Sequence, residues 1–274
     1  IGEARWRPPR DWDVAYASSP LDARLPAKAC PQFTGQLLNA SHMGEDCLLL
    51  NVWSPPTAEN APVLVWIHGG GFTQGSGNGY NGTELALRFG AIIVTINYRL
   101  GPLGFLALPE FRSESGIAGN WGLLDVISAL RWVQSCVQAF GGNQRRVTVF
   151  GQSAGASMVQ ALTHAPMSAG LFHAAISESR GTWQVPVSWA FEHSRVVLRR
   201  VGCDSEGSLL HCLRQVPVGR LLEAAGNPGK SNHFTDCLTV DDCTFFPPTL
   251  DGKVIVGDPL CGQLQGQAPP VHVP

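Results

Sequence analysis

Short apolar runs alternate with amphipathic segments over the first two thirds of the chain. Glycine- and proline-containing turns bound these runs, which are typical of buried strands. Strands are predicted at residues 47–53, 63–67, 91–98, 147–150 and 174–176. Helices are predicted at 123–140, where apolar residues recur every three or four positions, and at 154–163. Uninterrupted apolar strands separated by helices predict an α/β fold with a mostly parallel central sheet and helices on both faces.

The pattern changes after residue 181. Helices are predicted at about 188–201, 208–214 and 218–225, and the segments between them are rich in cysteine. We therefore expect residues 182–274 to be a helical, cysteine-rich cover of the same domain rather than further strands. Residues 1–274 would then form one α/β domain, which begins with irregular surface chain over residues 1–35.

Composition and charge exclude several classes of protein. The 274 residues are 44% hydrophobic, enough for a buried core, and carry 19 basic against 21 acidic side chains. This balance, without long basic runs, predicts no nucleic-acid partner. Residues 147–177 lack charged side chains, but they contain too many Ser, Gln, Thr and His residues for lipid. No transmembrane segment is predicted.

A Gly-x-Ser-x-Gly motif follows the strand predicted at 147–150 and precedes the helix predicted at 154–163. Its serine is Ser153, between Gly151 and Gly155. A serine on a sharp strand-to-helix turn needs nearly side-chain-free neighbours two positions away, and the helix N-terminus supplies partial positive charge. A glycine-rich structural turn is the simpler alternative. The setting favours Ser153 as a catalytic nucleophile.

A second glycine-rich loop, His68-Gly69-Gly70-Gly71-Phe72, follows the strand predicted at 63–67. Glycines allow backbone N–H groups to face a developing oxyanion, although a merely flexible loop would have the same composition. Its position ahead of Ser153 favours an oxyanion loop. We expect the donors to be the N–H groups of Gly70, Gly71 and Ala154, and we expect His68 to be structural rather than the catalytic base.

These motifs together resemble the type-B carboxylesterase/lipase family, the carboxylesterase and cholinesterase group of α/β-hydrolases. Further matching stretches lie, in the family's order, at residues 5–9, 45–52, 97–106, 119–125 and 140–143. The resemblance implies an α/β-hydrolase fold that lacks its C-terminal part, and hydrolysis of a small-molecule carboxylic ester through an acyl-enzyme on Ser153. It implies neither a metal nor an organic cofactor. The segment between Cys30 and Cys47 has no Trp where cholinesterases bind choline, so choline-ester selectivity is not expected.

The resemblance also implies covalent and ionic pairings. Cys30 with Cys47, and Cys203 with Cys212, match the family's disulfides, whereas Cys136, Cys237, Cys243 and Cys261 have no implied partner and Cys136 is expected to be a buried thiol. Arg5 with Glu45, and Arg99 with Asp125, match structural ion pairs of the family. Eight cysteines and the glycosylation acceptors at Asn39 and Asn81 favour a secreted or secretory-lumen protein.

The resemblance does not complete the catalytic machinery within this sequence. The fold's chain order is Ser, then Asp or Glu, then His, and the family's histidine lies much later in the chain than Ser153. His164 and His173, which flank the helix predicted after Ser153, are expected to be packing or surface residues. The chain is therefore expected to be an esterase segment cut at both ends, inactive by itself. Two alternatives stay open: a non-catalytic, cholinesterase-like adhesion or interaction module, and an inert truncated product.

Overall fold

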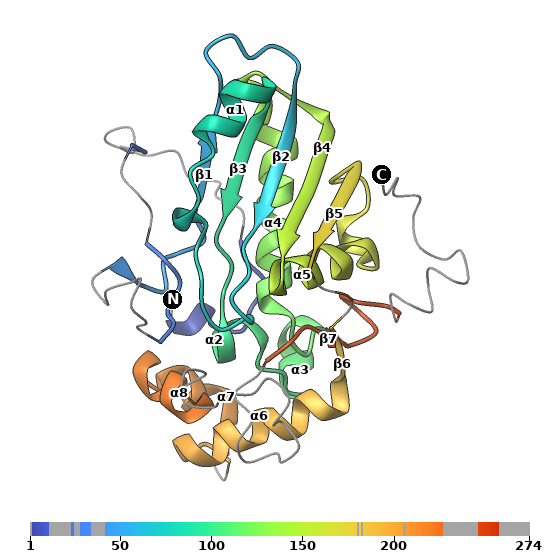
Figure 1. Ribbon diagram of the computed structural model, residues 1–274. Helices are drawn as coiled ribbons and strands as arrows, with labels where there is room; N and C mark the ends of the chain where they lie inside the picture. Colours follow the sequence, from blue (N-terminus) through green and yellow to red (C-terminus); the bar gives the residue numbers. More distant parts are fainter. Residues whose placement is uncertain are drawn as a thin grey trace.

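A five-stranded sheet forms the centre of the computed structural model (Figure 1), which describes residues 2–10, 23–24, 28–33, 42–179, 181, 183–204, 207–226 and 246–257. The strands are β1 (Leu50–Trp53), β2 (Ala61–Ile67), β3 (Ile92–Ile96), β4 (Gly142–Gln152) and β5 (Ala174–Glu178). Their spatial order is β1-β3-β2-β4-β5. Only the pairing of β1 with β3 is antiparallel within this sheet. The predicted mostly parallel α/β fold is confirmed.

One face of the sheet is covered by two helices, α4 (Trp121–Cys136) and α5 (Ala154–Thr163). In β2, buried residues alternate with half-buried ones, and Val63, Val65 and Ile67 are fully buried in the main core. The predicted helix 123–140 is in fact two elements, because α4 gives way to the 3-10 turn η4 (Val137–Phe140). Gly141 ends this turn with a φ of 80°.

The opposite face also carries a helix, as predicted, although the described residues cover it only in part. There α1 (Thr83–Phe89) packs through Ala86 against Ile93 and Leu64. Farther along the same face, Trp66, Phe150 and Ile176 lie side by side on paired strands. Trp66 and Phe150 are half-buried, and Ile176 is 38% exposed.

Three helices lie beyond the carboxyl ends of the parallel strands: α6 (Val187–Val201), α7 (Leu209–Gln215) and α8 (Val218–Ala225) (Figure 1). They match the three helices predicted at about 188–201, 208–214 and 218–225, and they lie at the end of the sheet rather than over a face. A second sheet pairs β6 (Val185–Pro186) with β7 (Thr249–Leu250), so this part does not extend the central sheet.

The remaining elements are short. They are η1 (Gly2–Ala4), η3 (Gly77–Gly79), α2 (Gly101–Phe105), α3 (Phe111–Ser115) and η5 (Pro166–Ser168). In the described parts of the chain, no helix has both the length and the apolar character that a bilayer crossing requires.

Candidate active site

Ser153 lies on the turn between β4 and α5, at the carboxyl end of the sheet. Its backbone is in an unusual conformation, with φ 57° and ψ −119°, although it is not glycine. Its N–H donates to the carbonyl of Glu178 on β5 at 3.0 Å, and its carbonyl accepts from the N–H of Ser157 at 3.1 Å. Strained backbone of this kind persists only where the surroundings fix it, and it clusters at functional sites.

The two motif glycines allow α5 to pack tightly against the end of β2. A Cβ on Gly151 would lie 2.7 Å from the carbonyl of Gly155 and 2.8 Å from that of Ile67. A Cβ on Gly155 would overlap the carbonyl oxygen of Ile67 and lie 2.9 Å from that of His68. Backbone atoms occupy these positions, so neither site has room for a side chain.

The glycine loop at residues 68–72 lies directly beside the serine. A Cβ on Gly69 would be 3.2 Å from the Cβ of Ser153. Gly70 and Gly71 have φ values of 111° and 61°, which favour glycine, and the Gly70 carbonyl accepts from the N–H groups of residues 73 and 74 at 3.1 Å. The structure thus brings together the two motifs that the sequence separates.

Three N–H groups near the serine have no acceptor within the part of the chain that the structure describes. Those of Gly70 and Gly71 make no hydrogen bond there. Ala154 is the first residue of α5, so its N–H has no intrahelical partner. These are the three donors expected from the sequence, and their role in holding an oxyanion stays a prediction.

His68 is buried and structural, as its loop position suggested. Its ring stacks on Tyr98 with centroids 4.4 Å apart, and its Nδ1 lies 2.8 Å from the carbonyl of Gly69. The Tyr98 hydroxyl donates to the His68 carbonyl at 2.8 Å. Burial lowers the pKa of His68 to about 4 and raises the pKa of Tyr98, so both groups are neutral near pH 7.

One supporting residue was not found from the sequence. The side-chain amide of Gln32 holds both backbone groups of Gly75, because its Oε1 accepts from the N–H at 2.9 Å and its Nε2 donates to the carbonyl at 2.8 Å. Nε2 also donates to the carbonyl of Cys30 at 3.1 Å. This clamp connects the disulfide region to the end of the glycine loop. The only sequence signal is that Gln32 follows Cys30 by two positions.

Among the described residues, no histidine or acidic side chain makes a hydrogen bond to Ser153. Its hydroxyl makes no hydrogen bond there. His164 is 8% exposed and lies with its Nδ1 2.7 Å from the Thr163 hydroxyl, and His173 is exposed. His193 stacks on Trp189 within α6. His233, Asp241, Asp242 and His272 lie outside the described residues.

Both disulfides that the resemblance implied are present, Cys30–Cys47 and Cys203–Cys212. Cys136 is a free thiol, but it is half-exposed rather than buried. The other three cysteines (Cys237, Cys243 and Cys261) lie outside the described residues.

Both implied ion pairs are formed, each at 2.7 Å: Arg5 with Glu45 and Arg99 with Asp125. The acceptor Asn81 is exposed, whereas Asn39 is outside the described residues. In the described ranges, no three His, Cys, Asp or Glu side chains gather in a metal-binding arrangement.

Comparison with known proteins agrees with this geometry. A profile of the carboxylesterase family matches residues 1–271. The chain belongs to the carboxylesterase family. It is 38% identical to para-nitrobenzyl esterase of Bacillus subtilis (strain 168), over 98% of this chain and 54% of that protein, and 44% identical to fumonisin B1 esterase of Sphingopyxis macrogoltabida, over 93% and 46%. A solved structure of PNB esterase superposes with a TM-score of 0.83 at 36% identity, covering 100% of this chain and 56% of the other.

The match establishes the α/β-hydrolase fold for this carboxylesterase-family chain and supports hydrolysis of carboxylic esters at the level of the family. The chain spans about half the length of the relatives that it matches.

Proposed function

We propose that the protein is a serine carboxylic-ester hydrolase that acts through an acyl-enzyme on Ser153. The observation that carries the proposal is the contact of the serine turn with the glycine loop, where a Cβ on Gly69 would lie 3.2 Å from the Cβ of Ser153. The hydroxyl oxygen of Ser153 attacks the ester carbonyl carbon, and the carbonyl oxygen becomes an oxyanion. The N–H groups of Gly70, Gly71 and Ala154 hold that oxyanion.

The remaining steps need a proton acceptor and donor. A histidine takes the proton of the serine hydroxyl and returns it to the departing alcohol, and an acidic residue orients that histidine. Water then attacks the acyl carbon and releases the carboxylic acid and free Ser153. We assign the histidine and the acid to sequence other than residues 1–274, since no histidine among the described residues contacts the serine and the histidine of the resembling family lies much later in the chain. The mechanism assigns no step to a metal or an organic cofactor.

The non-catalytic alternative is less well supported. An adhesion module has no need of a serine at a φ of 57° or of unoccupied N–H groups beside it. Hydrogen bonds to Glu178 and Ser157 hold the strained turn, and nucleophilic attack by Ser153 gives a reason for the strain.

We further propose that the protein folds in the secretory pathway and carries a glycan on Asn81. Two disulfides support an oxidising compartment. The Asn81 side chain is exposed at the start of α1, where an attached glycan would extend into solvent.

Hydrolysis of a chromogenic ester tests the proposed activity. The name of one relative makes a para-nitrobenzyl ester a suitable substrate. In a full-length version, Ser153→Ala should lower kcat by about 10⁴-fold or more. The matched control is Ser135→Ala, since the Ser135 hydroxyl bonds only within α4, to the carbonyl of Arg131 at 3.1 Å. Undiminished turnover in Ser153→Ala would refute the assignment.

The same assay tests where the base comes from. Residues 1–274 alone should hydrolyse the ester near background, because an oxyanion hole and binding without a base leave only about 10³–10⁴-fold acceleration over water. Robust hydrolysis by residues 1–274 would show that the base lies within them.

A further inference from the structure

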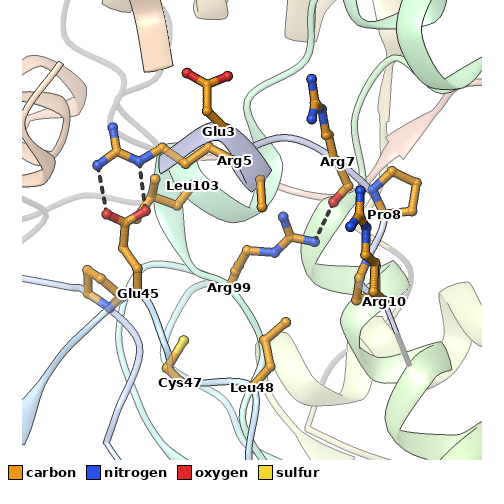
Figure 2. Close-up of a pocket in the computed structure, with 13 residues that line it drawn as sticks. Glu3, Arg5, Arg7, Pro8, Arg10, Glu45, Cys47, Leu48, Arg99 and Leu103 are labelled. Atoms are coloured by element: carbon orange, nitrogen blue, oxygen red, sulfur yellow. Dashed lines mark hydrogen bonds and ion pairs between the residues drawn. The ribbon is translucent and has the colours of Figure 1, made fainter. Parts of the chain in front are cut away.

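A pocket of about 390 Å³ lies between the N-terminal segment and the loop after β3 (Figure 2). None of its lining residues belongs to the glycine loop or to the serine turn. Four arginines line it, Arg5, Arg7, Arg10 and Arg99, against two carboxylates, Glu3 and Glu45. The proposed esterase mechanism uses none of these groups.

Two of the arginines are fixed by the fold. Arg5 makes a bidentate pair with Glu45, with both distances 2.7 Å, and its Nη1 donates to the carbonyls of Arg214 and Val216. Arg99 makes a bidentate pair with Asp125, also at 2.7 Å, and its Nη2 donates to the carbonyl of residue 7 at 3.0 Å. These pairs form rigid walls of the pocket.

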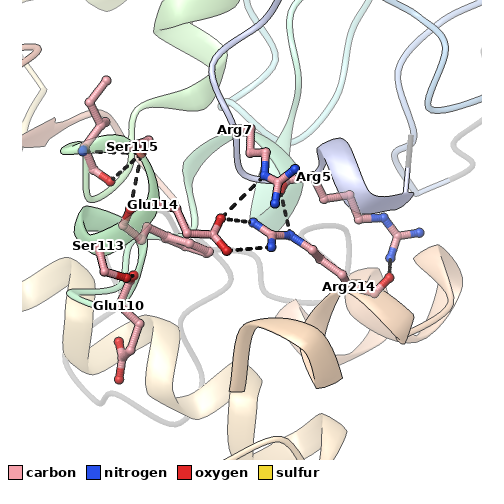
Figure 3. Close-up of polar contacts among 9 residues, drawn as sticks. Arg5, Arg7, Glu110, Ser113, Glu114, Ser115 and Arg214 are labelled. Carbon is pink, nitrogen blue, oxygen red and sulfur yellow. Dashed lines mark hydrogen bonds and ion pairs between the residues drawn. The ribbon is translucent and has the colours of Figure 1, made fainter. Parts of the chain in front are cut away.

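Several arginine N–H groups have no acceptor in the part of the chain that the structure describes. The Nη1 of Arg99 makes no hydrogen bond there, and no side-chain nitrogen of Arg10 does so. Arg7 reaches Glu114 only at 3.5 Å, and both oxygens of that carboxylate are already held by Arg214 at 2.9 and 2.5 Å (Figure 3). Free guanidinium donors therefore face this pocket.

The arginines are positioned before any ligand arrives. Pro8 and Pro9 separate Arg7 from Arg10 and restrict the backbone between them. In an extended proline-rich segment, residues three apart lie on the same side of the chain. Figure 2 shows Arg7 and Arg10 on the side of the pocket opposite the Arg5–Glu45 pair, with Arg99 between them.

The acidic residues at the pocket do not cancel this charge. Glu45 is neutralised by its own pair with Arg5. Glu3 accepts a hydrogen bond from Gln215 at 3.3 Å, and Figure 2 shows its carboxylate pointing away from Arg99. Among the residues that the structure describes, Arg10 has no carboxylate partner, so its positive charge stays available at the pocket.

The rest of the lining is apolar and includes Pro9, Pro31, Leu48 and Leu103. Leu48 is 42% exposed, so apolar surface lies open beside the guanidinium groups. Planar guanidinium donors match the two oxygens of a carboxylate, and the leucine and proline surface matches a short hydrocarbon body.

We propose that this pocket binds an organic monocarboxylate, with the carboxylate on Arg10 and Arg99 and its hydrocarbon chain against Leu48 and Leu103. Octanoate binding, measured by isothermal titration calorimetry on the intact protein, tests the site. We expect one saturable site in the wild type and in Ser153→Ala. Arg10→Gln should weaken it about tenfold (about 1.4 kcal/mol), and Arg10→Lys should weaken it less, because lysine keeps the charge but not the planar fork.

Arg145→Gln is the matched control, because Arg145 is exposed on β4 and none of the pocket lining comes from that strand. It should bind octanoate as the wild type does, and the melting temperature of every variant should stay unchanged. Octanol, which lacks the charge, and sulfate, which lacks the chain, should each bind at least tenfold more weakly.

Unchanged octanoate binding in Arg10→Gln, or the absence of saturable binding in the wild type, would overturn the proposal. If sulfate binds as tightly as octanoate, the proposal of an organic carboxylate is overturned, and the pocket is a site for a simple inorganic anion.

Discussion

Adding one methyl group at Gly155 should destabilise the protein by disrupting the contact between α5 and β2. In Gly155→Ala the new Cβ overlaps the carbonyl oxygen of Ile67 and lies 2.9 Å from the carbonyl oxygen of His68. Both neighbours are backbone atoms at the end of a central strand, so no side-chain rotation relieves the overlap. Overpacking usually costs about 1–3 kcal/mol, and we expect about 3 kcal/mol here.

The matched control is the same substitution where there is space. A Cβ on Gly219, within α8, meets no atom within 4 Å, and the residue does not have a positive φ. Gly219→Ala should therefore stabilise the protein by up to about 1 kcal/mol through helix propensity. Replacing glycine with alanine should therefore lower the free energy of unfolding at residue 155 and raise it at residue 219.

Urea unfolding followed by tryptophan fluorescence measures both effects. With a urea slope of about 1–3 kcal/mol per molar, Gly155→Ala should lower the unfolding midpoint by about 1–3 M. In a full-length version it should also lower kcat by about 10²-fold, because a shift of about 1 Å at the serine disturbs the reacting geometry. A midpoint equal to that of the wild type would refute the reasoning about backbone contact.

Three further substitutions test the surrounding structure by the same urea assay. Replacing Cys30 and Cys47 together with serine should cost about 3 kcal/mol, since the bridge closes a loop with a sequence separation of 17; a loss below 1 kcal/mol would contradict this. Burial raises the pKa of Glu45, but the hydrogen bonds and charge of Arg5 outweigh this effect and lower the pKa below its ordinary 4.5. The stability that the pair contributes is therefore present above pH 4.5 and is lost as the pH falls further. Glu45→Gln should cost about 3 kcal/mol of stability at pH 7, and a deficit that does not shrink below pH 4.5 would contradict the account. Burial lowers the pKa of His68 from 6.5 to about 4, so between these pH values the unfolded chain binds more protons than the folded protein and the stability falls as the pH drops. In His68→Asn this pH dependence of stability should be weaker. An unchanged slope of stability against pH would refute the assignment of His68 as a buried neutral group.

The sequence predicted elements whose local pattern agrees with their packing. α5 and α8 have the predicted bounds, because turn residues and the apolar period both mark their ends. β4 is longer than predicted, since its first half carries the exposed residues Arg145 and Arg146 and pairs with β2 across an irregularity. The pairing with β2 extends β4 through these exposed polar positions, and that pairing cannot be read from the local sequence pattern.

The elements that were missed are those in which tertiary contacts override local preference. α2 has the sequence Gly-Pro-Leu-Gly-Phe, a poor helix former, yet all five of its residues are buried. α1 exposes Leu87 at 61% and Phe89 at 64% beside the exposed Glu84 and Arg88, so apolar and polar residues are mixed on its outer face. Neither segment has the periodicity that identifies a helix.

Some residues of the candidate site could be predicted from the sequence, and others could not. Ser153 and the glycine loop could be recognised because their chemistry restricts residue type at adjacent positions. The clamp that Gln32 forms on Gly75 could not, because it joins residues 43 positions apart and uses a common side chain. The disulfides and ion pairs came from the family resemblance, because spacing alone does not select among the possible pairings.

The most direct test of the central claim is to trap the acyl-enzyme. A full-length version would be mixed with para-nitrophenyl acetate, quenched in acid, digested and analysed by mass spectrometry. We predict one acetyl group on the peptide that contains Ser153, and none on that peptide in Ser153→Ala. An acetyl group on another residue with normal turnover, or full turnover in Ser153→Ala, would contradict the account.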